Sequence, residues 1–158
     1  MIKIVAVGKC KEKDLVNCIK EYQKRLQPYC KLQIIEVEEQ MAPQGNSAAQ
    51  NEEIKLKEGR SLLAKIKDDE YVILLDLHGN MLSSEKFADK MQEIMTYKTS
   101  NITFVIGGSL GLSKEILDRA NYRWKFSDLT FTHQMCRYIL IEQIYRSFKI
   151  MRNEPYHK

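Results

Sequence analysis

The sequence predicts a single α/β domain built on a mainly parallel sheet of five to six strands, with helices on both faces. Three observations support this prediction. Short apolar runs alternate with helical patterns along the chain, an order that produces βαβ units. One run, "YVILLDL" at 71–77, is apolar at nearly every position, as in a strand buried on both faces. The length of 158 residues suits one domain with a sizeable core.

Two strands and two helices are predicted in the first half of the chain. "IKIVAV" at 2–7 has the pattern of a strand. A helix follows from Asp14, with one apolar face made by Leu15, Ile19, Tyr22 and Leu26. Pro28 ends this helix, and "KLQIIEV" is the second strand. The segment 41–51 has loop composition, and a helix from about Glu52 to Ile66 follows it.

The second half of the chain is predicted to contain three further strands. They are "YVILLDL", "ITFVI" and a weaker one around "RWKFS". Ser83 or Ser84 caps the helix after the first of them, and Ser113 caps the short helix "KEILDRAN". A long final helix runs from about His133 to Met151.

Composition places the chain among ordinary globular proteins. Apolar residues make up 44% and charged residues 29% of the chain, which disfavours disordered and fibrous classes. No apolar run approaches the roughly 20 residues of a membrane span, and "MIKIVAVGK" lacks the apolar core of a signal peptide. We therefore expect a cytoplasmic protein without a membrane partner. The four cysteines form no C-x-x-C pair, so free thiols are favoured over a disulfide.

Unusual sequence follows three of the predicted strands. The segments are "LLDLHGNMLSS", "VIGGSLGLS" and "FSDLTFTHQMCR". Ligands of open α/β sheets bind beyond the carboxyl ends of the strands. We therefore expect the ligand site at these three ends.

The glycine stretch "FVIGGSLGLS" at 104–113 does not match a phosphate-binding motif. Its spacing is G-G-x-x-G, which differs from the dinucleotide fingerprint G-x-G-x-x-G, and it lacks the Lys and hydroxyl residue of a P-loop. Two interpretations remain. The glycines form a turn whose backbone approaches a flat ligand, or they only allow a tight turn and close helix packing.

Asp76 and His78 place a carboxylate and an imidazole two residues apart at a strand end. Side chains at this spacing point the same way in a strand. No third group nearby completes a metal site or a catalytic triad, so a solvated strand end is the favoured interpretation.

His133 and Arg137 lie at i and i+4 at the start of the final helix. Spacing alone favours a histidine at a helix start with a surface arginine, although a cation there could meet an electron-rich substrate. The chain ends in Tyr156, His157 and Lys158. Such a tail is usually frayed, yet an aromatic ring among basic groups also suits stacking on an unpaired RNA base.

The positive charge is unevenly distributed. Residues 1–113 contain 16 Lys+Arg and 16 Asp+Glu, whereas residues 114–158 contain 9 and 5. The whole net charge of +4 therefore lies in the last segment. A bound polyanion is expected to meet this C-terminal third.

Taken together and in this order, five segments resemble the ribosomal RNA large subunit methyltransferase H family, of the SPOUT class. They are "IKIVAVGKCKEK", "GNMLSSE", "FVIGGSLGL", the block "RW-FS-LTFTHQMCR-ILIEQIYR" and the terminal "PYHK". The resemblance covers essentially the whole chain, 1–158. It implies an α/β domain whose C-terminal part, about 70–158, forms a deep trefoil knot and carries the cofactor site. It also implies a homodimer that methylates N3 of a pseudouridine in 23S ribosomal RNA, with free RNA, the large subunit and the whole ribosome left open as the form of the substrate.

The resemblance further implies S-adenosylmethionine as methyl donor, with no metal. The matching cofactor contacts are Leu75, Gly107, Phe126, Ser127, Asp128, Leu129, Thr130 and Phe131. The matching catalytic and substrate-side residues are His133, Arg137, Tyr156 and His157. Because an imide N3–H is a weak acid, we expect Arg137 to stabilise the anion that develops, and His133 or His157 to accept the proton.

One position departs from the family pattern. The family usually has proline before the histidine at 133, whereas this chain has Thr132. Loss of proline is expected to loosen the helix start. This departure is the one feature that favours an alternative, a non-catalytic RNA-binding or ribosome-associated protein on the same fold. A third interpretation, a flavodoxin-like nucleotide enzyme, lacks the expected phosphate motifs.

Overall fold

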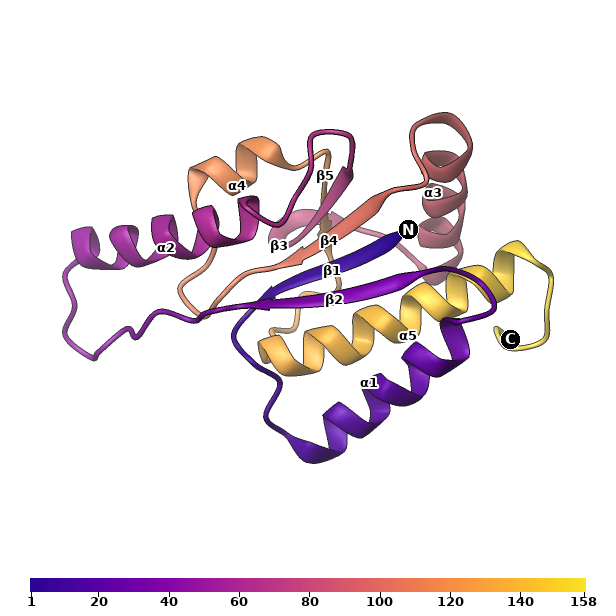
Figure 1. The fold of residues 1–158 in the computed structure, drawn as a ribbon, viewed down its shortest axis with the longest axis horizontal. Helices are drawn as coiled ribbons and strands as arrows, with labels where there is room; N and C mark the ends of the chain where they lie inside the picture. The colour runs from indigo at the N-terminus through magenta and orange to yellow at the C-terminus, as the bar shows by residue number, and fades with distance from the viewer.

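A computed structural model describes all 158 residues and shows one five-stranded parallel sheet, in the order β2-β1-β4-β3-β5 (Figure 1). The strands are β1 (Ile2–Val7), β2 (Leu32–Val37), β3 (Tyr71–Met81), β4 (Ile102–Ile106) and β5 (Tyr122–Lys125). The helices are α1 (Lys13–Leu26), α2 (Ala48–Leu63), α3 (Ser84–Tyr97), α4 (Lys114–Arg119) and α5 (His133–Met151). The predicted fold class and the order of elements are confirmed.

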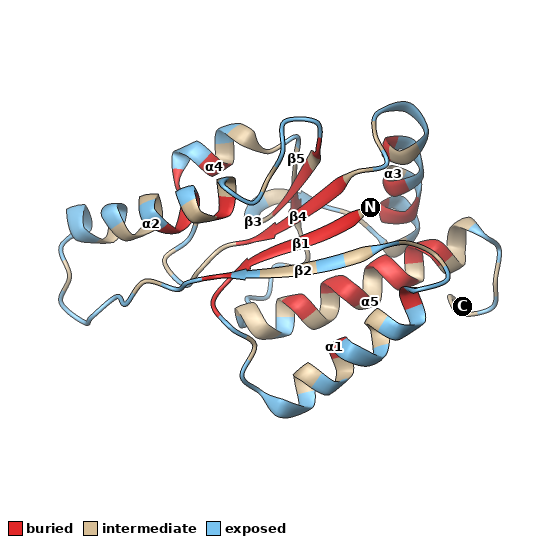
Figure 2. Cartoon of the chain, in the orientation of Figure 1, coloured by how far each residue is buried: buried red, intermediate tan, exposed pale blue.

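The helices cover the sheet on both faces. Alternation along β1 sends Ile2, Ile4 and Ala6 to the face packed by α1, α3 and α5, while Val5 and Val7 face α2 and α4 (Figure 1). The inner strands and much of α5 are buried (Figure 2). No helix combines the length and the apolar character needed to span a lipid bilayer.

Two predicted boundaries on α2 are wrong. The segment 41–51 is not wholly a loop, because α2 begins at Ala48. Ser47 caps it: its hydroxyl accepts from the N–H of Gln50, whose side chain in turn accepts from the N–H of Ser47. This capping box adds four residues to the helix. The helix ends at Leu63 instead of Ile66.

Strand β3 is longer than predicted and pairs with β5 in two places. Residues Ile73–Leu75 pair with Tyr122–Trp124, and Asn80–Met81 pair again with Trp124–Lys125. The residues between, 76–79, form a bulge in this ladder. A Cβ on Gly79 would lie 2.6 Å from the carbonyl carbon of Arg123, so only glycine allows this close approach of the bulge to β5.

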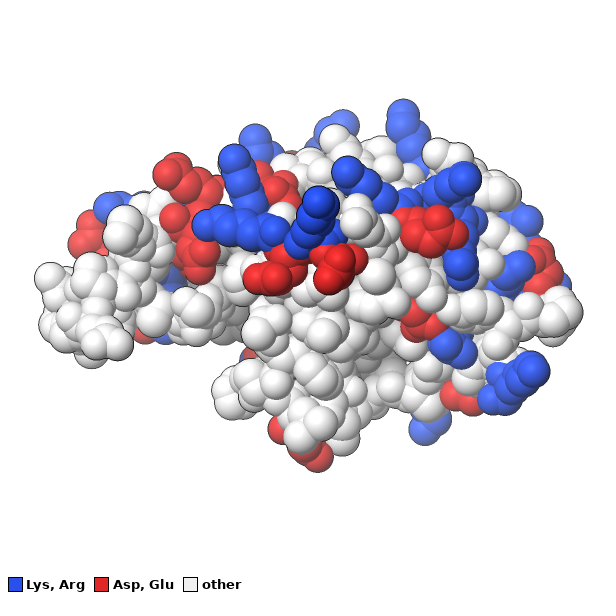
Figure 3. All heavy atoms as spheres, turned by 90° about the horizontal axis from the view of Figure 1, so that it is seen from below, with Lys and Arg blue, Asp and Glu red and all other residues white.

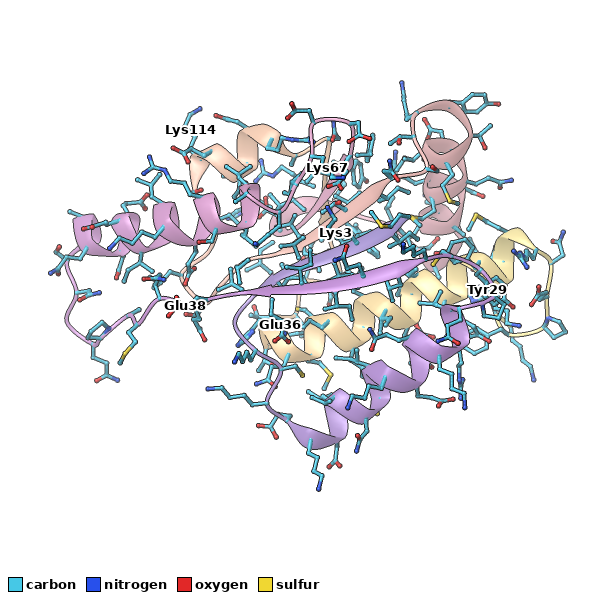
Figure 4. The ribbon with its side chains drawn as sticks, viewed as in Figure 1. Lys3, Tyr29, Glu36, Glu38, Lys67 and Lys114 are labelled. Atoms are coloured by element: carbon cyan, nitrogen blue, oxygen red, sulfur yellow. The ribbon has the colours of Figure 1, made fainter.

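A buried ion pair joins the amino ends of the central strands. The ammonium of Lys3 donates to Glu70 Oε1 at 2.5 Å, and the hydroxyl of Thr103 donates to Glu70 Oε2 at 2.8 Å. Figure 4 shows Lys3 within the sheet. Both buried charges are therefore paired within the protein. They lie at the amino ends of the strands, on the opposite edge of the sheet from the loops at the carboxyl ends.

Candidate functional site

One cavity of about 680 Å³ lies at the carboxyl ends of β3, β4 and β5. Its lining comes from residues 75–78, 106–112 and 123–133 except Asp128, with single residues added from three helices. These are the segments that follow the three strands. The parallel arrangement of the strands brings the loops to the same edge of the sheet.

The glycine segment after β4 forms a tight turn at this cavity. Gly111 has a φ of +97°, a left-handed conformation that favours glycine, and its N–H donates to the carbonyl of Gly108 at 3.2 Å. Gly107 packs closely against a side chain instead: a Cβ there would lie 2.6 Å from Cδ2 of Leu112, which would have to move. The turn is thus closely packed and also presents its backbone to the cavity.

Seven of the eight residues implied as cofactor contacts line this cavity: Leu75, Gly107, Phe126, Ser127, Leu129, Thr130 and Phe131. Asp128 does not. Its side chain is 79% exposed and pairs with Lys125. The structure therefore separates the Asp128 carboxylate from the cavity.

His133 opens α5 and lines the cavity. Thr132 is the N-cap of this helix, and its hydroxyl accepts from the N–H of Met135 at 3.3 Å. A threonine supplies this acceptor and a proline cannot. This capping bond opposes the loosening of the helix start that the loss of proline is expected to cause.

Two buried ring nitrogens at the cavity have no hydrogen-bond partner: Nε1 of Trp124 and Nδ1 of His133. Trp124 stacks on Phe87 with ring centroids 4.0 Å apart, which holds the plane of the indole. Buried polar atoms are nearly always paired in folded proteins. The two nitrogens therefore fit a ligand that brings polar atoms into the cavity, whose lining combines aromatic and apolar side chains with charged ones such as Lys55, Asp76 and Arg123.

Arg137 lies outside the cavity, one helical turn after His133. It is 2% exposed, so the expectation of a surface arginine is wrong. Its guanidinium donates to Glu36 Oε1 at 2.8 Å and to the carbonyls of Val7 and Gly8 at 2.9 and 2.6 Å. Figure 4 shows Glu36 beside the start of α5. Arg137 thus ties α5 to the carboxyl ends of β1 and β2.

The tail is not frayed, because Tyr156 packs against α1 and α5. Its hydroxyl lies 2.9 Å from that of Tyr22 and donates to Glu142 Oε1 at 3.0 Å. Its ring meets Tyr145 edge-on at 4.9 Å between centroids. Burial, and then the bonds with Tyr22 and Glu142, raise the pKa of the Tyr156 phenol. The docked phenol therefore stays protonated at neutral pH.

His157 is held between two helices. Its Nδ1 lies 3.1 Å from Nη1 of Arg146, and its Nε2 lies 2.8 Å from Oε1 of Glu85. The N–H of Glu85 itself, and next His157, lower the pKa of the Glu85 carboxyl to about 2. Arg146 is 13 residues beyond His133 on α5, which is roughly 20 Å along the helix. The tail of a chain therefore lies far from the cavity of the same chain.

Asp76 and His78 form no catalytic or metal pair. Asp76 is ion-paired with Arg123, and one of its oxygens also accepts from the backbone N–H of His78 at 3.0 Å. The His78 side chain faces solvent. No three His, Cys, Asp or Glu side chains of the structure are grouped so that they could hold a metal ion.

Two features of this region escaped the sequence analysis. Gly8 turns the chain after β1 with a φ of +80°, and a Cβ there would lie 3.3 Å from Cε1 of His133. A glycine directly after a buried strand was the available signal. Lys55 of α2 also lines the cavity. The local sequence does not indicate a role for Lys55, because only the packing of α2 brings it to the cavity.

Comparison with known proteins defines the class. A family model described as "Predicted SPOUT methyltransferase" matches residues 1–157. A solved structure titled as a probable methylase family protein from Haemophilus influenzae Rd KW20 superimposes with a TM-score of 0.54 at 16% identity. It covers 96% of this chain and 66% of that chain, and at this identity it supports the fold alone. The fold and the matching model together define a SPOUT methyltransferase.

Curated relatives are more specific. A protein from Clostridium perfringens (strain SM101 / Type A) named ribosomal RNA large subunit methyltransferase H 1 is 52% identical over 157 residues. Proteins named ribosomal RNA large subunit methyltransferase H from Carboxydothermus hydrogenoformans and Listeria monocytogenes are each 54% identical. Each alignment covers 99% of both chains. The chain belongs to the ribosomal RNA large subunit methyltransferase H family.

Proposed function

We propose that the protein transfers a methyl group from S-adenosylmethionine to N3 of a pseudouridine in 23S ribosomal RNA. The observation that carries this proposal is the cavity at the three strand ends, which seven of the eight implied cofactor residues line. Relatives named ribosomal RNA large subunit methyltransferase H, which align over 99% of their length, support it. Because its substrate is ribosomal, the protein would work in the cytoplasm.

The cavity suits the donor chemically. Backbone around Gly107 and the aromatic ring of Phe126 would lie against the adenine and sulfonium parts, and the unpartnered Nε1 of Trp124 would meet a polar atom. The bound donor supplies a methyl group on a positively charged sulfur. The protein's own task is then to hold donor and base in line and to assist loss of the N3 proton.

His133 is the residue of this chain best placed for that assistance. It lines the cavity, and its buried Nδ1 has no hydrogen-bond partner within the chain. Arg137 is occupied by three acceptors behind Gly8. We therefore assign Arg137 to positioning α5 and His133. Arg137 would then influence an anion on the base only through its electrostatic field, and not through a direct hydrogen bond.

A second copy of the chain would complete the site. Tyr156 and His157 lie some 20 Å along α5 from His133, by the helix rise. In a homodimer with two-fold symmetry the tail of one chain can lie at the cavity of its partner. Tyr156 and His157 would then act on the base bound by the other subunit.

The double pairing of β3 with β5 supports the proposed trefoil knot. Strand β3 pairs with β5 on both sides of residues 76–79, and α5 follows β5 in the chain. We propose that the chain is threaded at this point.

The activity is tested by calorimetry and by methylation of ribosomes. We expect S-adenosylmethionine to bind the purified protein, and labelled cofactor to mark ribosomal RNA from a strain that lacks the gene. Free RNA, large subunits and whole ribosomes are assayed separately. Cofactor binding without label in any of the three would favour the non-catalytic alternative. Absence of binding would contradict the methyltransferase itself.

The surface that meets RNA is proposed to lie on α1. In the C-terminal third, six of nine cations are already paired with carboxylates: Lys114, Arg123, Lys125, Arg137, Arg146 and Lys149. By contrast Lys13, Lys20 and Lys24 are exposed and make no ion pair. Their spacing of seven and four residues puts them on one line of the helix. Figure 3, a view from the side of α1 and α5, shows Lys and Arg side chains interspersed with Asp and Glu along one side of this face.

Replacing Lys13, Lys20 and Lys24 with glutamine is expected to weaken binding to ribosomal RNA. Loss of up to three phosphate contacts should lower the slope of log affinity against log salt by about two to three. Filter binding at several salt concentrations measures both effects. Glutamine at Lys65, Lys67 and Lys98, exposed at the amino ends of the strands, is the matched control. Equal losses in the two triple variants would contradict a localised RNA surface on α1.

A further inference from the structure

Glu58 is a buried acid outside the residues already assigned. It lies on α2 and is 4% exposed. Its Oε1 accepts from the N–H of Gln40, just after β2, at 3.0 Å. Its Oε2 has no hydrogen-bond partner. Burial raises the pKa of the Glu58 carboxyl, although the bond from Gln40 opposes this shift.

Close contact between α2 and α4 places Glu58 beside the turn that follows β4. A Cβ on Gly59 would lie 2.2 Å from Oγ of Ser113, the residue that caps α4. Only glycine lets the two helices approach to this distance. The preceding residue is thereby directed under the glycine turn that follows β4.

The Glu58 carboxyl lies directly against Gly108. A Cβ on Gly108 would be 2.5 Å from Oε2 of Glu58 and 3.1 Å from its Cδ. Gly108 does not have a positive φ. The carboxyl therefore occupies the space that a side chain at position 108 would take, so a Cβ there would displace the buried Glu58 carboxyl, whereas the backbone conformation does not require glycine.

We propose that Glu58 is a positioning residue for the donor-binding turn: its carboxyl sets the place of Gly108 and so of the neighbouring Gly107. This inference rests on the proposed function, because it takes the turn as a cofactor contact. Glu58 links α2, the segment after β2 and the turn after β4. It holds the turn in the shape that the donor needs before binding, which lowers the ordering cost of binding.

The contact predicts a pattern among variants. G108A should lower affinity for S-adenosylmethionine about tenfold or more, because its methyl group would overlap the carboxyl. E58A should lower it about tenfold by leaving the turn unsupported. In the double variant E58A/G108A the alanine has room, so affinity should exceed that of G108A alone. E58Q keeps the shape and the bond from Gln40, and should bind within a few fold of the natural protein.

Calorimetry measures these affinities, with E53Q on the exposed side of α2 as the matched control. The proposal would be overturned if the fold losses of affinity in E58A and G108A multiplied in the double variant. It would also be overturned if E58A bound S-adenosylmethionine as tightly as the natural protein. An E58Q variant as weak as E58A would overturn it too, since charge and not shape would then be the requirement.

A readout without cofactor separates this proposal from the proposed function. Hydrogen exchange of the amides at 107–111 should be faster in E58A than in the natural protein and unchanged in E53Q. Unfolding in urea should show G108A less stable than the natural protein and partly rescued by E58A. Natural protein that binds no S-adenosylmethionine would contradict the proposed function. Unchanged exchange in E58A would overturn the role of Glu58 in either case.

Discussion

The R137A variant is expected to lose about 3 kcal/mol of unfolding free energy, toward the low end for breaking a buried ion pair. The guanidinium of Arg137 donates hydrogen bonds to the carboxylate of Glu36 and to the carbonyls of Val7 and Gly8. Its side chain is 3% exposed, while that of Glu36 is 34% exposed, and water at Glu36 reduces the loss. Urea unfolding followed by circular dichroism measures the change.

R25A is the control for the change of side chain. Arg25 also pairs with a carboxylate, Glu21, but both are exposed, so R25A should leave stability nearly unchanged. The unfolding free energy of R137K should lie between those of R137A and the natural protein, because one ammonium cannot reach three separated acceptors. If R137A unfolds like the natural protein, the guanidinium does not anchor the strand ends and is available to a substrate.

Removing Tyr156 to Lys158 is expected to abolish methyl transfer, and mixing should restore part of it. The truncated chain keeps its own His133, and an H133A chain keeps its own tail. If each site combines one cavity with the partner's tail, a mixed dimer contains one intact site. Random exchange of subunits should then recover about one quarter of natural activity. Label transfer to ribosomes, before and after joint refolding, measures the recovery.

The control is a mixture of H133A with a chain that carries both changes. This mixture contains no intact site and should stay inactive. Activity that never returns in the first mixture, with dimers confirmed by light scattering, would contradict a shared site. Full activity of the truncated chain alone would show that the docked tail has no part in transfer.

Sequence reasoning was most successful where the signal was local. The strands "IKIVAV" and "ITFVI" and the helix from His133 to Met151 have the predicted limits. Their apolar patterns and cap residues are local properties of the chain. The resemblance named the family, which the full-length relatives confirm. It also named residues that the structure then brings to one cavity.

Other features depend on contacts between distant segments. Arg137 and His133 share a helix face, yet one is closed behind Gly8 and the other lines the cavity. Burial of Lys3 needs Glu70, which is 67 residues away. The contact of Glu58 with Gly108 spans two helices and a turn. No short window of sequence contains both Lys3 and Glu70, or both Glu58 and Gly108.

The sequence by itself determined the α/β class, most element limits and the family. Local propensity and the spacing of apolar residues are sufficient for these. Only the tertiary structure decided which polar side chains are free at the cavity and which are already paired. Pairing depends on burial and on distances of about 3 Å between segments far apart in the chain. These distances exist only after the sheet has brought its carboxyl ends together.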